Sequence, residues 1–259
     1  MAELDQEQPF ISHLLELRTR LLRMLAGILL VALVLLPFAN PIYELLAKPL
    51  LAHLPIGSQM VAIDPISPFM TPMKLTLIVA LFIAVPWILY QVWAFVAPGL
   101  YQHEKRLAIP LLLASTILFY CGMVFAYYII LPIFFAFIVS TAPAGVAVMT
   151  DISKYLDFVL TMFIAFGVAF EVPIAVIMLV MLGVITPEAL VARRPYVIIG
   201  AFTLGMVLTP GSDVVSQTLL AVPMWWLFEA GVLVARMLAK QRSTAAPTTA
   251  VDHYDNKQV

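Results

Sequence analysis

The stretch LAIPLLLASTILFYCGMVFAYYIILPIFFAFIVSTAPAGVAVMT, residues 107–150, contains no Asp, Glu, Lys or Arg. A membrane-spanning helix needs about 20 predominantly apolar residues. This run is therefore long enough for one span with an outer segment, or for two spans. The choice decides the topology of the whole chain, because one extra span reverses the side of the membrane on which every later segment lies.

The composition places the chain in a membrane. It has 259 residues, of which 63% are hydrophobic and 11% are charged. Soluble domains are usually about 45–50% apolar and about 25% charged. A single core could not bury this much apolar surface, so we predict a polytopic membrane protein. The formal net charge of −1 does not indicate a nucleic-acid partner, and the single cysteine, Cys121, excludes an intrachain disulfide framework.

Basic residues orient the spans, because Lys and Arg are concentrated in cytoplasmic loops. Four clusters fit that side: Arg18, Arg20 and Arg23; Lys105 and Arg106; Arg193 and Arg194; Arg236, Lys240 and Arg242. Lys257 near the end of the chain joins them, so 11 of the 14 basic residues lie inside. Only Lys48, Lys74 and Lys154 lie outside. An even number of spans must separate the second cluster from the third. Residues 107–150 therefore hold one span and an outer piece that is broken by TAPAG at 141–145.

The predicted fold is an all-α integral membrane protein with six transmembrane helices and both termini in the cytoplasm. Residues 1–242 form one membrane domain, and the polar segment 243–259 is a disordered cytoplasmic tail. Spans five and six rise only about 23 Å, against a hydrocarbon thickness of about 30 Å. Such short spans either thin the bilayer locally or form a hairpin that neighbouring helices bury. The expected spans are roughly 22–39, 73–96, 107–129, 155–181, 195–209 and 214–229.

The first outer segment, residues 40–72, carries six prolines and cannot be one regular helix. Within it, the apolar residues of IYELLAKPLLAHL at 42–54 recur at helical spacing. We expect a broken amphipathic helix that lies on the outer face of the protein. An irregular loop is the alternative.

One carboxylate lies deep in a span, in AFGVAFEVPIAV at 165–176. Glu171 costs at least about 2.5 kcal/mol at that depth unless it has a partner or faces water. Pro173 cannot donate to the carbonyl of Ala169, which frees a further acceptor. We interpret Glu171 as a polar element of a transport path. The alternative is a protonated side chain that hydrogen-bonds to another helix.

Polar residues also open the sixth span. Asp213 suits an N-cap, and Gln217 lies one turn inside, where an amide can hydrogen-bond to another transmembrane helix. The sequence has no H-E-x-x-H, no nucleophile elbow and no P-loop. We therefore expect no enzyme activity, no metal and no cofactor.

The basic end of the first span contains an isolated carboxylate, in HLLELRTRLLR at 13–23. Glu16 precedes Arg20 by four residues, the favourable order for an ion pair within a helix. Glu16 is either the partner of Arg20 or a site for a cation from another molecule. Glu104 places a second carboxylate in the basic rim, beside Lys105 and Arg106.

Four segments in order carry a resemblance to a known family: HLLELRTRL (13–21), FVAPGLYQHEKR (95–106), AFGVAFEVP (165–173) and LTPGSDVVSQ (208–217). Together with six spans, they resemble the TatC family, the large receptor subunit of the twin-arginine, Sec-independent protein translocase. The resemblance extends from about residue 10 to about residue 235.

The resemblance implies a concave, cup-like bundle in a bacterial inner membrane that self-associates in a larger complex. It implies binding of twin-arginine signal peptides of folded precursors at the cytoplasmic face, and assembly with single-span TatA- and TatB-type subunits. The implied roles are as follows: Glu16, Glu104, Phe95 and Arg18 in signal-peptide binding; Glu171 as an intramembrane polar site; Gln217 and Asp213 in partner-helix docking; Pro49 and Phe69 in outer-loop function.

Elementary chemistry agrees with a receptor for paired arginines. Each guanidinium is a planar fork that grips a carboxylate through two hydrogen bonds, and lysine cannot replace it. Exposed ion pairs contribute only about 0.2–1 kcal/mol, so most affinity should come from the apolar part of the signal. Two rivals stay open: a proton- or ion-coupled secondary transporter that uses Glu171, and a passive assembly scaffold. No repeated half-architecture supports the transporter.

Overall fold

The structure is a computed structural model, and it describes residues 3–51, 60–96, 108–141, 150–208 and 214–245. Side chains are described for 11–45, 62–96, 109–138, 140–141, 151–208 and 214–240. Helices account for almost all of this part of the chain. This agrees with the predicted all-α membrane fold.

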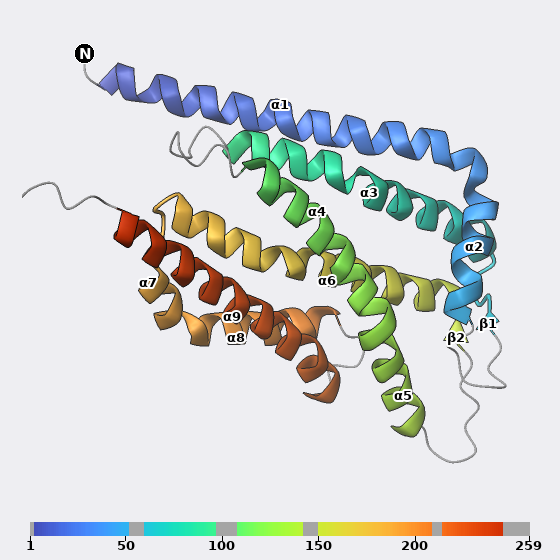
Figure 1. The fold of residues 1–259 in the computed structure, drawn as a ribbon. Coiled ribbons are helices and arrows are strands. Elements are labelled where there is room, and N and C mark those ends of the chain that lie inside the picture. Colours follow the sequence, from blue (N-terminus) through green and yellow to red (C-terminus); the bar gives the residue numbers. More distant parts are fainter. Residues whose placement is uncertain (1–2, 52–59, 97–107, 142–149, 209–213, 246–259) are drawn as a thin grey trace, which may run out of the picture.

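The chain begins with a long helix and a sharp turn. Helix α1 (Glu3–Leu35) is followed by a single 3₁₀ turn (Leu36–Phe38) and by α2 (Ala39–Leu51). Pro37 lies in that turn, where its missing N–H and its ring end the regular helix. Figure 1 shows α2 bending away steeply from the end of α1. Helix α2 confirms the helix expected in the outer segment, and residues 52–59 lie outside the described residues.

Helix α3 (Ser67–Val96) lies alongside α1 over most of its length (Figure 1). Pro86 lies inside it and cannot donate to the carbonyl of Phe82. The hydroxyl of Tyr120, on the next helix, donates to that carbonyl over 2.9 Å. A neighbouring side chain therefore satisfies the acceptor that the proline frees, as an interior without water requires.

Within the stretch 107–150, residues 108–141 form one continuous helical rod, as the single-span interpretation requires. It consists of α4 (Ala108–Phe125), a π-helical turn (Ala126–Ile130) and α5 (Leu131–Thr141). The π turn comes directly before Pro132, which cannot donate to the carbonyl of Tyr128. The helix continues to Thr141, beyond the end predicted at residue 129, because the residues between them are almost all apolar and TAPAG begins only at residue 141.

Two short strands join the segments that precede α3 and α6. Strand β1 (Met60–Val61) pairs in parallel with β2 (Thr150–Asp151), with Met60 opposite Thr150. The sequence analysis did not predict them, since two residues carry no periodicity. Asp151 then caps α6 (Ile152–Met181) by accepting a hydrogen bond from the backbone N–H of Ser153.

Helix α6 is the centre of the fold and packs against both α4 and α9 (Figure 1). Gly122 of α4 lies so close to α6 that an added Cβ would collide with the backbone carbonyl oxygen of Phe166. The backbones of α4 and α6 are in direct contact here, because glycine has no side chain to separate them. The core around this crossing contains Ala126, Ile130, Leu131, Tyr155, Leu156, Val159, Met162, Phe166 and Leu220.

The last part of the chain is a short helix and a long one. After α7 (Pro187–Ala192), helix α8 (Arg194–Leu208) has 15 residues and is short, as predicted. Helix α9 (Val214–Ala245) has 32 residues, so the prediction of a short sixth helix is wrong for the helix as a whole. Its apolar run ends near residue 229, but Arg236 and Lys240 favour a helix as well as any residue.

Five helices in the described part of the chain are long and apolar enough to cross a membrane, and α8 is a shorter apolar helix beside them. The count of six spans and the cytoplasmic position of both termini remain predictions. Residues 243–245, which the sequence analysis placed in the tail, belong to α9. Residues 246–259 lie outside the described residues.

Candidate functional site

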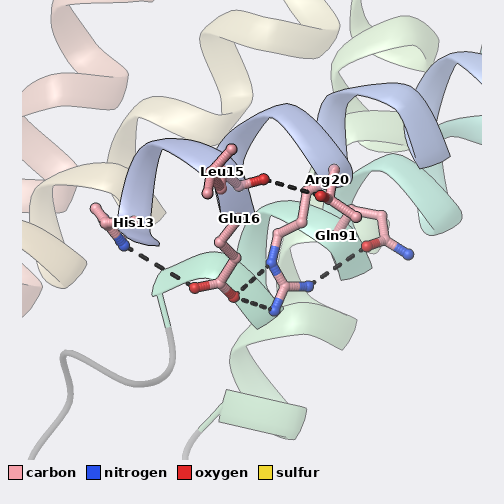
Figure 2. A network of polar contacts seen from close by, with 6 residues as sticks. His13, Leu15, Glu16, Arg20 and Gln91 are labelled. Carbon is pink, nitrogen blue, oxygen red and sulfur yellow. Dashed lines mark hydrogen bonds and ion pairs between the residues drawn. The ribbon is translucent and has the colours of Figure 1, made fainter. Parts of the chain in front are cut away.

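The first site is built on α1 around one ion pair. The Nη2 and Nε atoms of Arg20 lie 2.6 and 2.9 Å from the same carboxylate oxygen of Glu16, Oε1 (Figure 2). The third nitrogen, Nη1, donates to the side-chain oxygen of Gln91 on α3 over 3.4 Å. Gln91 is only 2% exposed. Helix α3 therefore holds the guanidinium, and the guanidinium holds one edge of the carboxylate.

The other carboxylate oxygen faces an aromatic pair. Oε2 of Glu16 lies 4.0 Å from Nδ1 of His13, one helical turn earlier (Figure 2). The His13 ring stacks on Phe95 of α3, with ring centroids 4.3 Å apart and planes 16° from parallel. The spacing of three and four residues puts His13, Glu16 and Arg20 on one face of α1. That face meets the last turn of α3.

Exposure differs across the pair. The Arg20 side chain is 16% exposed, whereas that of Glu16 is 36% exposed. The cation is covered by α3 and the anion remains accessible. The basic end of α1 therefore presents the accessible carboxylate of Glu16, and its partner Arg20 lies against α3.

A second contact fixes α1 to α3 one turn further along. The indole N–H of Trp87 donates to the backbone carbonyl of Arg23 over 3.0 Å. The indole lies against Gly27, where any Cβ would collide with the ring. These contacts set the position of α1 relative to α3, and so the position of Glu16 relative to Phe95.

The structure brings some of the predicted binding residues together. Glu16 and Phe95 both contact His13, so they belong to one site. Arg18 is exposed and, two residues from Glu16, lies on a different face of α1. Glu104 lies outside the described residues, so its position beside Glu16 remains a prediction.

Glu171 forms a separate polar site between α3, α4 and α6. The hydroxyl of Ser115 on α4 lies within hydrogen-bonding reach of the Glu171 carboxyl group. Trp93 of α3 donates to the same hydroxyl over 3.4 Å. The Oε1 atom of Glu171 is buried and has no hydrogen-bond partner among the described residues. One oxygen of this carboxyl group is therefore buried without a hydrogen-bond partner in the described part of the chain.

The remaining predicted residues lie elsewhere. Gln217 is part of the α8–α9 contact, where a Cβ on Gly205 would lie 3.1 Å from the Gln217 carbonyl oxygen. Phe69, in the first turn of α3, is 64% exposed. Pro49 lies in α2, but its side chain is outside the described residues, as is Asp213.

Sequence reasoning missed Gln91, although a glutamine in the predicted span 73–96 was a usable signal. Asp157 and Glu229 received no partners from the sequence. Asp157 pairs with Lys74 at 2.6 Å, and Glu229 pairs with Arg194 at 2.6 Å. Within the described ranges, no cluster of His, Cys, Asp or Glu could hold a metal ion.

Comparisons with known proteins agree on one family. The family model described as Sec-independent protein translocase protein (TatC) matches residues 12–223. The TatC proteins of Haemophilus influenzae and Escherichia coli K12 are 58% and 54% identical to this chain. These matches cover 91% and 90% of this chain, and 92% and 90% of the two relatives. The Aquifex aeolicus protein is 38% identical over 90% of this chain and 97% of its own.

A solved structure shows the same fold. The crystal structure titled Twin Arginine Translocase Receptor TatC superposes with a TM-score of 0.79 and is 38% identical in sequence. The match covers 88% of this chain and 99% of the solved one. A second crystal structure of that receptor, in the detergent DDM, gives a TM-score of 0.77.

Proposed function

The chain belongs to the TatC family and is a subunit of the Sec-independent protein translocase, and on that premise we propose that Glu16 receives an arginine of the signal peptide. Phe95 and Arg18 shape this site, and Glu104 supplies the second carboxylate. Two carboxylates on separate segments of the basic rim then read the two arginines. The peptide belongs to a folded precursor that the translocase exports.

The observation that carries this proposal is the one-sided contact between Glu16 and Arg20. Both short contacts from Arg20 go to Oε1, and Oε2 lies 4.0 Å from His13. A carboxylate has lone pairs for about four hydrogen bonds. An incoming guanidinium therefore has an oxygen to bind without displacing Arg20. Arg20 acts as a positioning residue that holds the carboxylate in one orientation.

The stacked rings of His13 and Phe95 support the same assignment. Arginine packs its planar guanidinium on aromatic faces as well as on carboxylates. The two rings are parallel, 4.3 Å apart, and adjoin Oε2. A signal-peptide arginine that reaches Oε2 would pass beside this aromatic surface. Lysine would keep the charge and lose both the fork and the stacking.

The apolar part of the signal needs a separate surface, because an exposed ion pair gives only about 0.2–1 kcal/mol. Helix α1 offers one. Leu15, Leu22, Leu29 and Leu33 are 55%, 55%, 56% and 73% exposed. They recur every four or seven residues and lie along one side of the helix. We place the apolar segment of the signal along this side, in the membrane.

The wider assembly follows from the family. We propose that the protein lies in a bacterial inner membrane with both termini in the cytoplasm, and self-associates in a larger complex. Single-span TatA- and TatB-type subunits dock near Gln217 and Asp213, where α8 and α9 meet. Glu171 acts after the signal has bound, and Pro49 and Phe69 act in the outer loops.

Site-specific photocrosslinking tests the proposal. A photoreactive residue is placed at position 16, 95 or 104 of the full chain, and a twin-arginine signal peptide is added to membranes. We expect crosslinks at all three positions, and their loss with a twin-lysine peptide of equal charge. Position 44 is the control, since Glu44 is exposed on α2 and lies away from the proposed path of the signal along α1.

Other outcomes favour the rivals. Equal crosslinking of both peptides would refute recognition of the arginine fork. Crosslinks to partner subunits alone would favour a passive scaffold. Uptake of a small substrate into vesicles, abolished by Glu171→Ala, would favour a secondary transporter.

A further inference from the structure

Two consecutive arginines, at the junction of α7 and α8, face different surroundings. Arg194 turns toward α9, where its Nη2 lies 2.6 Å from Oε2 of Glu229. Arg193 is exposed, and none of the ion pairs within the described residues includes it. One arginine therefore has a structural role in holding the α8–α9 hairpin. The other presents a charge outward.

Arg193 and Tyr196 are the described residues that line an open cavity of about 460 Å³. Tyr196 is 74% exposed and lies in the first turn of α8. A guanidinium and a phenol hydroxyl together offer a charged fork and a neutral donor. This donor set suits the unesterified oxygens of a phosphodiester, which arginine grips through two hydrogen bonds.

An apolar strip on α8 starts at this cavity. Tyr196, Ile199, Thr203 and Val207 follow one another at intervals of three or four residues, so they share one side of the helix. Ile199 is 64% exposed and Val207 is 76% exposed. A ligand with a phosphodiester head and a long hydrocarbon chain matches the order of groups along this side.

The length of α8 brings lipid headgroups to the cavity. Its 15 residues rise about 23 Å, whereas the hydrocarbon core is about 30 Å thick. A short span draws the surrounding headgroups inward or binds something that covers its ends. Basic pockets between helices at the cytoplasmic side bind anionic headgroups, and aromatic residues lie at the same level.

We propose that Arg193 and Tyr196 form a binding site for the phosphodiester headgroup of an anionic phospholipid, with an acyl chain lying along the exposed side of α8. The site is distinct from the signal-peptide site on α1 and α3. A lipid bound at this site anchors the end of the short helix α8 at the level of the headgroups. The bilayer is expected to be thinned there to match the length of α8.

Native mass spectrometry of the purified full chain in a neutral detergent tests the site. Bound dioleoylphosphatidylglycerol is counted during a titration, and dioleoylphosphatidylcholine is titrated in parallel. Wild type should retain phosphatidylglycerol in preference. Arg193→Gln should weaken its apparent affinity about fivefold, the factor that about 1 kcal/mol per basic residue implies. Arg193→Lys should restore only part of the loss, since it keeps the charge without the fork.

Arg236→Gln is the matched control, because Arg236 is another exposed arginine on this chain and has the same charge. It should leave the affinity unchanged. An equal loss in both variants would reduce the effect to surface charge and overturn the site. Equal retention of phosphatidylglycerol and phosphatidylcholine would overturn the anionic headgroup site. The exposed side of α8 would then be assigned to neutral lipid or to a partner helix. Displacement by inorganic phosphate alone would show a phosphate site without a lipid chain.

Discussion

The Trp93 indole of α3 and the Ser115 hydroxyl of α4 are joined by a hydrogen bond of 3.4 Å, and Glu171 of α6 lies within reach of the same hydroxyl. Both Trp93 and Ser115 are buried. Trp93 lies between Gln91 and Phe95 on α3, which belong to the candidate binding site on α1 and α3. Helix α3 therefore carries one contact to the Glu16 site and, on another face, a contact to Ser115 beside Glu171.

Ser115→Ala should destabilise the protein more than a surface hydroxyl deletion. It leaves the indole N–H of Trp93 buried without an acceptor, which costs about 1–3 kcal/mol. Thermal unfolding in detergent measures the change. Ser140→Ala is the control, because the Ser140 hydroxyl is exposed and donates only to the carbonyl of Phe137 in its own helix. Equal stability of the two variants would show that the contact at Ser115 contributes nothing.

Glu171→Ala should leave initial signal binding nearly intact and impair later steps of export. Glu171 belongs to the contact among α3, α4 and α6, and within the described residues no hydrogen bond or ion pair joins it directly to Glu16. Crosslinking of a signal peptide to the cytoplasmic face reports the first step, and protease protection of a precursor in vesicles reports export. Glu171→Gln is the control for lost charge at retained shape. Loss of surface crosslinking in the alanine variant would contradict this separation of roles.

Gly122→Ala should force α4 away from α6. Its Cβ would collide with the backbone carbonyl oxygen of Phe166, which cannot move as a side chain can. Overpacking of this kind costs about 1–3 kcal/mol, and thermal unfolding measures it. Gly200→Ala is a matched control within α8, where an added Cβ meets nothing within 4 Å. It should be neutral or stabilising by up to about 1 kcal/mol, because alanine favours a helix over glycine. Equal destabilisation by both substitutions would argue against the close crossing.

The helices could be predicted because apolar runs and basic clusters are long-range averages over many residues. Their ends could not. Helix α5 continues to Thr141 and α9 to Ala245, and both exceed the predicted spans. Hydropathy locates the membrane, whereas a helix ends where backbone chemistry stops it. The apolar chain before TAPAG and the residues after Glu229, which include Arg236 and Lys240, are equally able to stay helical.

The sites divide in the same way. The pair of Glu16 and Arg20 is local, so a spacing of four residues was enough to predict it. Contacts of α1 with Gln91 and of Glu229 with Arg194 join residues 71 and 35 positions apart. Such distances depend on helix packing, and a single sequence carries no record of which faces meet. The chemistry of each polar residue was readable, but the identity of its partner was not.

Arg20 either positions Glu16 for the signal peptide or competes with the peptide for it. If Arg20 only positions the carboxylate through Oε1, Arg20→Gln should weaken peptide binding, because Glu16 loses its fixed orientation. If Arg20 blocked the site, the same change would strengthen binding. Glu16→Gln should weaken binding by up to about fivefold, the range of an exposed ion pair, and Glu16→Lys should weaken it further by repulsion.

Fluorescence anisotropy of a labelled twin-arginine peptide, titrated with the full chain in detergent, measures these affinities. Glu44→Lys is the control for a change of two charges, since Glu44 is exposed on α2, far along the chain from the site. The difference between wild type and Glu16→Lys should shrink as salt rises, because exposed charges are screened over about 10 Å at 0.1 M. Tighter binding by Arg20→Gln would show that Glu16 must first be released from Arg20, and that Oε2 alone does not receive the signal.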